Sequence, residues 1–343
     1  MLVCVTGGTG YVGAHSVAAI LRAGHQVRLL ARDESAVDRA MTPLGIPPGD
    51  LDVAVGDVLD EASVARVVRG ADVVLHAASV YSFDPRHRRE LCRTNENGTE
   101  LVLAQARASG VRRTVYVSSV AALFPSPHAP LHADSPVGRA RESYLASKAA
   151  ADRVARRHQA EGAPVAITYP PALLGPHDPK LGDGTRRLRD TLRGLMPLWP
   201  LGGFPLGDVR DTAALHASLV TGDGAARYFG PGHYLTTRRY LHTLREVTGR
   251  TLPAGYLPAR VMLPVGALAG LVQRVWPWHI PAEYGAIYTC ASATRVDETA
   301  DTNGLVSRPT AETFADTVRW LHRAGHLTDR AAGRLATRST VVG

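Results

Sequence analysis

The sequence of 343 residues is poor in cysteine, in lysine and in long apolar runs. Its three cysteines, Cys4, Cys92 and Cys290, lie far apart, which argues against a disulfide framework and a cysteine zinc site and indicates a reducing compartment. The longest apolar stretch, Val261 to Val272, is interrupted by Pro264 and is too short to cross a bilayer. We therefore expect a cytoplasmic protein without a stable membrane span, in which this stretch forms an amphipathic or pocket-lining helix.

Charge and composition exclude further classes of protein. The formal net charge is +8, but the arginines are scattered and do not alternate with aromatic residues, so we expect no nucleic-acid partner. The histidines His15, His76, His177 and His216 have no metal-ligand spacing, and we assign no metal. With 45% hydrophobic residues the chain is expected to be globular. The start leads straight into an apolar strand and a glycine turn, so we expect no export signal.

Short β-branched runs alternate with helical patterns through residues 1–170, which predicts an α/β domain built on a doubly wound parallel sheet. Six strands are expected, near 2–6, 26–31, 51–56, 72–77, 114–118 and 164–169. Helices are expected near 12–23, 34–41, 60–69, 88–109 and 141–161. The looser pattern after Pro170 predicts a smaller C-terminal substrate-binding lobe over 171–330, with helices near 183–195, 237–249, 259–275 and 310–324. Some of its segments could return to the first domain, and 331–343 is expected to be a tail.

A glycine-rich turn joins the first strand to the first helix. In Gly7-Gly8-Thr9-Gly10-Tyr11-Val12-Gly13, Gly7 permits a tight turn, Gly10 lets backbone N–H groups approach a pyrophosphate, and Gly13 allows close helix packing. Tyr11 and Val12 begin the helix whose N-terminus faces the phosphates. The alternative is a purely structural turn, but the strand and helix around it indicate a dinucleotide-binding Rossmann domain.

Arg32 follows the second strand, where NAD-dependent enzymes usually have the carboxylate that binds the ribose 2′-hydroxyl. A guanidinium suits a 2′-phosphate instead, so the sequence favours NADP. The neighbouring Asp33 leaves NAD as the alternative. Competition between NADPH and NADH separates the two.

Small and polar residues end the third and fourth strands, at the edge where ligands of such sheets bind. Asp57 and Val58 end the third strand, and Ala77, Ala78 and Ser79 end the fourth. We expect all five to line the cofactor. Asp57 could accept a hydrogen bond from the adenine amino group, or it could cap the next helix.

Tyr144 and Lys148 are four residues apart in a helical pattern and therefore share one face. An ammonium group near the phenol is expected to lower the pKa of Tyr144 from about 10, so that the tyrosine can exchange a proton with a carbonyl oxygen. Ser119, at the end of the fifth strand, can hydrogen-bond to the same oxygen. Only two lysines occur in the chain, so such a spacing is expected by chance about 0.06 times.

Together these residues resemble the extended short-chain dehydrogenase/reductase family, in particular its dihydroflavonol-reductase-like and epimerase/dehydratase-like members, over about residues 1–325. Further matching motifs are Gly56-Asp57-Val58, Asn95-Glu96-Asn97-Gly98-Thr99, Ser118-Ser119, Pro170 to Pro176 and Gly207-Asp208-Val209-Arg210-Asp211. The resemblance implies that Ser119, Tyr144 and Lys148 are catalytic, with Ser118 as the alternative serine. It also implies that Lys148 binds the nicotinamide ribose, that Pro170 and Leu173 line the carboxamide, and that the chain can form a homodimer through its helices near 88–109 and 141–161.

Two positions depart from the family pattern. Tyr169-Pro170 stands where many relatives have Arg-Pro, which puts a contact to a diphosphate sugar in doubt. Ser119-Val120-Ala121 lacks the acid pair that usually follows the serine in sugar dehydratases. The combined pattern predicts an NADPH-dependent ketoreductase that converts a ketone to a secondary alcohol.

The substrate is expected to be apolar, because several aromatic residues fall in loops or in the second lobe. These are Tyr81, Phe83, Phe124, Trp199, Trp276 and Trp278. The alternatives are an NAD(P)-dependent sugar-nucleotide epimerase, a 3β-hydroxysteroid-dehydrogenase-like enzyme attached to a membrane through the helix near Val261, and a non-catalytic dinucleotide sensor.

Overall fold

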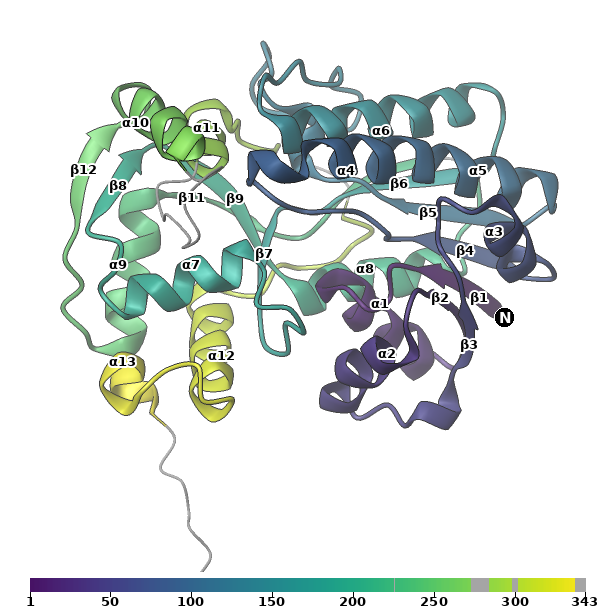
Figure 1. Cartoon of the computed structure of the whole chain (residues 1–343), viewed down its shortest axis with the longest axis horizontal. Helices are drawn as coiled ribbons and strands as arrows, with labels where there is room; N and C mark the ends of the chain where they lie inside the picture. Colours follow the sequence, from purple (N-terminus) through teal and green to yellow (C-terminus); the bar gives the residue numbers. More distant parts are fainter. Residues whose placement is uncertain (225, 273–283, 298–301, 337–343) are drawn as a thin grey trace, which may run out of the picture.

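The computed structural model describes residues 1–224, 226–272, 284–297 and 302–336. A large parallel sheet with helices on both faces lies beside a smaller group of helices and short sheets (Figure 1). In the described residues, no helix is long and apolar enough to cross a membrane.

The central sheet has seven parallel strands in the order β10-β6-β5-β4-β1-β2-β3. The strands are β1 (Leu2–Thr6), β2 (Gln26–Ala31), β3 (Asp52–Val55), β4 (Val73–His76), β5 (Arg113–Val117), β6 (Val165–Tyr169) and β10 (Ala226–Phe229). The Rossmann-type α/β fold and the six expected strands are confirmed. The seventh strand was missed because it is a four-residue segment far along the chain that extends the sheet beside β6.

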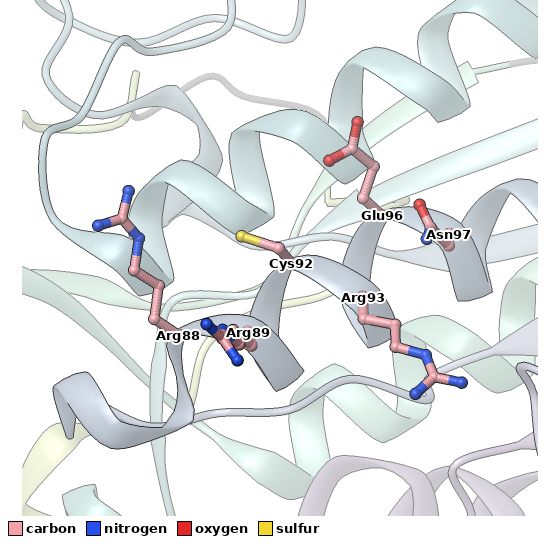
Figure 2. Close-up of a pocket in the computed structure, with 6 residues that line it drawn as sticks. All are labelled: Arg88, Arg89, Cys92, Arg93, Glu96 and Asn97. Atoms are coloured by element: carbon pink, nitrogen blue, oxygen red, sulfur yellow. The ribbon is translucent and has the colours of Figure 1, made fainter.

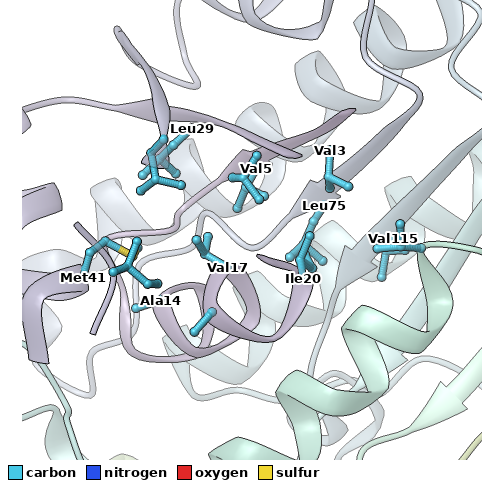
Figure 3. Close-up of a cluster of buried hydrophobic side chains, with 14 of the residues drawn as sticks. Val3, Val5, Ala14, Val17, Ile20, Leu29, Met41, Leu75 and Val115 are labelled. Atoms are coloured by element: carbon cyan, nitrogen blue, oxygen red, sulfur yellow. The ribbon is translucent and has the colours of Figure 1, made fainter. Parts of the chain in front are cut away.

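Helices cover both faces of this sheet. One face packs against α1 (Tyr11–Arg22), α2 (Glu34–Met41) and α8 (Val209–Leu219). The other packs against α3 (Glu61–Val68), α5 (Gly98–Ala108) and α6 (Ser143–Ala160). Side chains alternate along β1, so that Val3 and Val5 join the core under α1 while Cys4 joins the opposite core (Figure 3). This packing fixes the glycine turn between β1 and α1 in place.

The helix expected over 88–109 is divided into three. It consists of α4 (Arg88–Cys92), a π-helical turn η4 (Arg93–Asn97) and α5. The stretches before and after the π-helical turn each keep a helical spacing of apolar residues. The sequence therefore did not reveal the short turn between them.

The second lobe contains two small sheets and a separate hydrophobic core. Its strands are β7 (Ala172–Leu174), β8 (Leu198–Leu201), β9 (Gly203–Asp208), β11 (His233–Thr236) and β12 (Gly255–Pro258). Its helices are α7 (Asp183–Leu192), α9 (Thr237–Thr248), α10 (Ala259–Val272), α11 (Tyr284–Ser292), α12 (Thr310–Arg323) and α13 (Asp329–Ala332). The four expected helices are confirmed, whereas the strands were missed because proline and glycine interrupt their pattern.

The chain crosses between the two parts after Pro170. Both α8 and β10 follow Pro170 in sequence but belong to the large sheet and its helices, and Ser16 of α1 hydrogen-bonds to His216 of α8 at 2.8 Å. The tail was predicted too early, because Ala331 and Ala332 are buried in the second core. Residues 337–343 lie outside the described residues.

Candidate active site

The glycine turn can be made only by glycine at two of its positions. Gly7 has a positive φ of 79°, and a Cβ there would lie 2.4 Å from the backbone nitrogen of Ala78. A Cβ on Gly13 would lie 2.2 Å from the carbonyl oxygen of Gly7. At Gly10 a Cβ would lie 3.3 Å from the carbonyl oxygen of Gly7, a tight contact but much less restrictive than those at Gly7 and Gly13. The end of β4 thus packs closely against Gly7. Gly10 has no side chain that could cover the backbone N–H groups of the turn.

The N-terminus of α1 is free to bind an anion. Its N-cap residue, Gly10, provides no side-chain cap, and the first turn contains no acidic residue. The first N–H groups of Tyr11 and Val12 therefore have no capping side chain, and the helix dipole favours negative charge there. These features fit the pyrophosphate of a dinucleotide.

Arg32 is exposed just beyond β2 and makes no ion pair with any described residue. The neighbouring Asp33 is engaged locally, because its carboxylate accepts hydrogen bonds from the backbone nitrogen and the hydroxyl of Ser35 at 2.9 and 2.7 Å. These bonds lower the pKa of Asp33 and cap α2. The guanidinium is therefore the available group at this position.

The ends of β3 and β4 lie at the same edge of the sheet. Asp57 accepts a hydrogen bond from the backbone nitrogen of Leu59 at 2.9 Å, but the N-cap of α3 is Asp60. The alternative in which Asp57 caps that helix is therefore wrong. Val58 packs toward the start of α5, and the exposed Ser79 donates a hydrogen bond to Asn95 at 3.1 Å.

Ser119 and Tyr144 meet at the carboxyl end of β5. The Ser119 hydroxyl accepts a hydrogen bond from the backbone nitrogen of Ala121 at 3.2 Å, and a hydrogen bond with Ser119 lowers the pKa of Tyr144. Ser118 is turned away and donates to Asp152 at 2.8 Å. The structure therefore brings Ser119, and not the alternative Ser118, to the phenol.

The expected lowering of the Tyr144 pKa is wrong for this structure. Burial is the largest influence and raises the pKa of Tyr144 above its usual value of 10.0, and the nearby carboxylate of Glu142 raises it further. Lys148 lies on the same helix but donates its hydrogen bond to the carbonyl oxygen of Val117 at 3.2 Å. Burial lowers the pKa of Lys148 to about 8, and Asp152 opposes this change. The phenol is therefore protonated at neutral pH.

Asn95 is a site residue whose role the sequence did not reveal. It lies in the π-helical turn η4, is 1% exposed, and accepts a hydrogen bond from the backbone nitrogen of Val80 at 2.7 Å. Its amide nitrogen donates to the Val80 carbonyl and to the Ser147 hydroxyl, both at 3.0 Å. Asn95 thus ties the loop after β4 to the helix that holds Tyr144. Its match to the family motif was the available signal.

Two of the expected substrate residues lie beside Tyr144. Tyr81 and Phe83 place their rings edge-to-face with the Tyr144 ring, at centroid distances of 4.7 and 5.7 Å. Tyr81 is 45% exposed, whereas Phe83 packs against Gly285 of α11. The loop after β4 therefore forms an aromatic wall next to the phenol.

Two other expected substrate residues are buried elsewhere. Phe124 is 1% exposed and Trp199 is 2% exposed, and each belongs to a hydrophobic core. Trp199 packs against the tilted ring of Tyr240 and donates a hydrogen bond to the Met196 carbonyl at 2.9 Å. The expectation that they contact substrate does not fit these positions. Trp276 and Trp278 lie outside the described residues.

The segment after β6 lies next to the serine. The carbonyl oxygen of Pro170 accepts a hydrogen bond from the backbone nitrogen of Val120 at 3.0 Å, and Leu173 is half-buried in β7. Tyr169, where the family pattern has arginine, is fully buried and hydrogen-bonds to Arg156 at 2.9 Å. The Tyr169 side chain therefore packs in the protein interior and is not available to contact a ligand.

A separate surface hollow of about 540 Å³ runs along α4 and η4 (Figure 2). It is lined by Arg88, Arg89, Cys92, Arg93, Glu96 and Asn97. None of the expected site residues lines it, so this hollow is distinct from the Ser119 and Tyr144 site.

Two known proteins are similar to this chain along most of its length. The chain is 30% identical to sterol demethylase protein B of Methylococcus capsulatus over 332 residues, which cover 95% of this chain and 99% of that protein. It is 34% identical to a putative dihydroflavonol 4-reductase of Synechocystis over 74% of each chain.

Solved structures with the same fold are more distant in sequence. The crystal structure of gox2253 has a TM-score of 0.76 at 24% identity, over 95% of this chain and 99% of that one. UDP-glucose 4-epimerase from Bifidobacterium longum, in complex with NAD+ and UDP, has a TM-score of 0.73 at 19% identity over the same shares. The model of the NAD dependent epimerase/dehydratase family matches residues 3–216. Together with the similarity to the full-length relative, this match shows that the chain belongs to the NAD dependent epimerase/dehydratase family, within the extended short-chain dehydrogenases/reductases.

Proposed function

We propose that this enzyme is an NADPH-dependent ketoreductase that uses Ser119, Tyr144 and Lys148 to reduce an apolar ketone to a secondary alcohol. The observation that supports it best is the hydrogen bond between Tyr144 and Ser119 at the carboxyl edge of the sheet, where the glycine turn also lies. A relative from Stigmatella aurantiaca that is named a ketoreductase is 29% identical over 81% of each chain.

The proposed chemistry assigns one task to each side chain. Bound NADPH supplies the hydride. Tyr144 donates its proton to the carbonyl oxygen, and Ser119 donates a hydrogen bond to the same oxygen. Lys148, on the next turn of α6, supplies a positive charge that favours the phenolate as the proton leaves.

The cofactor would be held along the edge formed by the ends of β1 to β4. We assign its phosphates and adenosine to Gly7, Gly10, Tyr11, Val12, Gly13, Arg32, Asp57, Val58, Ala77, Ala78 and Ser79, and its nicotinamide end to Lys148, Pro170 and Leu173. The choice of NADP over NAD rests on Arg32, which forms no ion pair with the described residues, and on Asp33, whose carboxylate is used as a helix cap.

The substrate class follows from the surface next to the phenol. Tyr81 and Phe83 both contact Tyr144, and α11 packs behind Phe83. An aromatic wall of this kind suits the apolar body of a ketone better than a sugar diphosphate.

Sugar-nucleotide epimerisation is the second candidate, because the solved relatives named above include an epimerase. A dehydratase is disfavoured by the turn after Ser119, where η5 (Val120–Leu123) consists of buried apolar residues and provides no acid–base pair. An epimerase would show no net consumption of added NADPH, which separates the two reactions.

The test is an NADPH-consumption assay with a panel of apolar ketones. Replacing Tyr144→Phe should lower kcat by at least about 100-fold, because it removes the proton donor, while NADPH binding is retained. The matched control is Tyr228→Phe in β10, which should keep normal turnover. Unchanged turnover in Tyr144→Phe would remove the tyrosine from the mechanism.

A further inference from the structure

A buried carboxylate lies on the catalytic helix but has no role in the proposed chemistry. Asp152 is fully buried and follows Lys148 by four residues, so the two lie on the same face of α6. Its Oδ1 accepts a hydrogen bond from Ser118 at 2.8 Å, and its Oδ2 pairs with Arg156 at 2.8 Å. The Tyr169 hydroxyl also donates to Oδ2, at 3.4 Å. A buried charge is retained only where such partners satisfy it.

Arg156 extends the network to two further segments. Besides Asp152, it donates hydrogen bonds to the Tyr169 hydroxyl in β6 and to the Ser135 carbonyl, both at 2.9 Å. Tyr169 is the position at which the chain departs from the Arg-Pro pattern, and its hydroxyl accepts a hydrogen bond from Arg156 of α6. The network thus joins α6, the end of β5, β6 and the loop after η5.

The end of β5 contacts one face of α6 through three consecutive residues, each of which hydrogen-bonds to one residue of the helix. Lys148 donates to the Val117 carbonyl, Ser118 donates to Asp152, and Ser119 hydrogen-bonds to Tyr144. On the helix, Tyr144, Lys148 and Asp152 are spaced by four residues each. Asp152 therefore makes the last of three hydrogen-bonded contacts that position α6 against the end of β5.

We propose that Asp152 is a positioning residue of this site, which holds α6 in register with the end of β5 and keeps Lys148 charged. The proposal rests on the function proposed above, because it assigns Lys148 a role as a cation beside Tyr144. Removing the carboxylate should weaken the hydrogen bond from Ser118 and should also remove the negative charge near Lys148.

The other groups around Lys148 do not replace this carboxylate. From β4, His76 is buried and neutral, with its pKa lowered by burial to about 3. From β5, the Tyr116 ring lies 5.7 Å from the Lys148 ammonium, and on α6 Tyr144 is protonated. Asp152 is the carboxylate that opposes the loss of charge on Lys148.

Around Asp152 itself, burial is the largest influence and raises the pKa of its carboxyl group, while Arg156, Ser118 and Lys148 act against this increase and favour the carboxylate. The Tyr169 phenol, facing it from β6, is also buried and stays protonated because burial raises its pKa. Arg227 of β10 faces that phenol and favours its ionisation to a smaller extent.

The charge on Lys148 can be measured without any substrate, because the chain contains only two lysines. Protein labelled with ¹³C at the lysine Cε should give two NMR signals, and Lys180→Arg, at an exposed position, leaves that of Lys148 alone. We expect Lys148 to titrate at about 8 and to titrate lower by about one pH unit or more in Asp152→Asn. An unchanged titration would overturn the charge role, whether or not ketone reduction is the reaction.

The positioning role is tested by activity and pH dependence. Asp152→Asn should lower kcat by about tenfold at pH 8 and move the alkaline limb of the rate profile to lower pH by the same shift as the Lys148 signal. Asp152→Glu provides a carboxylate again, so the alkaline limb of the rate profile should return towards its wild-type pH. A loss of activity that follows only a lower Tm, with the limb unmoved, would reduce Asp152 to a structural residue and overturn the proposal.

A second variant covers the case in which Asp152→Asn does not fold. Ser118→Ala removes one hydrogen bond and leaves the carboxylate in place. It should lower kcat several-fold while the Lys148 titration stays near its original value. Full activity in Ser118→Ala would refute the claim that this hydrogen bond positions α6 against the end of β5. If ketone reduction fails with every substrate but the Lys148 shift occurs, the proposed reaction is wrong and the charge role of Asp152 stands.

Discussion

Replacing Arg32 with alanine should change the preference of the enzyme between NADPH and NADH. Arg32 is exposed beyond β2, and the carboxylate next to it in sequence, Asp33, is bound to Ser35. A guanidinium that binds a 2′-phosphate makes two charge-assisted hydrogen bonds, each contributing about 1.5 kcal/mol at the lower end of the usual range. Solvent screening at this exposed position leaves a loss of about 2 to 3 kcal/mol, which corresponds to a fall of roughly 30- to 150-fold in kcat/KM.

The assay compares initial rates with NADPH and with NADH for the wild type and Arg32→Ala. Only the value for NADPH should fall, because NADH has no 2′-phosphate. The matched control is Arg22→Ala, an exposed arginine at the opposite end of α1, which should change neither value. An equal loss with both cofactors, or a wild-type preference for NADH, would refute the assignment of Arg32.

Further predictions concern the glycine turn and two buried histidines. Gly7→Ala should prevent normal folding, because its Cβ would meet the backbone of Ala78 at 2.4 Å. Gly10→Ala should fold with a similar Tm but raise the Kd for NADPH by about tenfold, the cost of roughly one hydrogen bond, and calorimetry measures both effects. His76 and His216 have pKa values lowered by burial from 6.5 to about 3, so the unfolded chain binds protons that the folded chain does not. The free energy of unfolding should therefore fall as pH drops from about 6.5 towards 3, and denaturant titrations that show no decrease over that range would contradict this.

The sequence predicted the elements whose signals are local. The strands of the large sheet have apolar runs, and their helices repeat at a helical spacing, so tertiary packing and local pattern agree. The glycine turn was predicted for the same reason, since Gly7 and Gly13 are required by contacts within the first two elements and the end of β4. The hypothesis for Tyr144 and Lys148 came from a spacing that follows directly from helix geometry, and both residues lie on α6.

The missed features depend on contacts between distant segments. Asn95 acts through a π-helical turn and through hydrogen bonds to the loop after β4 and to α6, none of which has a local signature. Phe124 and Trp199 were assigned to substrate because aromatic residues in loops and cores look alike in a sequence, and only burial separates them. The strand β10 was missed because its partner, β6, lies about 60 residues earlier in the chain.

The error over the Tyr144 pKa bears on the direction of the reaction. Burial is the largest influence on the phenol and raises its pKa, the carboxylates Glu142 and Asp183 act in the same sense, and the hydrogen bond with Ser119 acts against them. A protonated tyrosine is the form that donates a proton to a ketone, whereas alcohol oxidation requires the phenolate as the base. If the proposed reaction is correct, oxidation of the alcohol product should become faster as the pH rises, and initial rates measured in both directions across pH would test this.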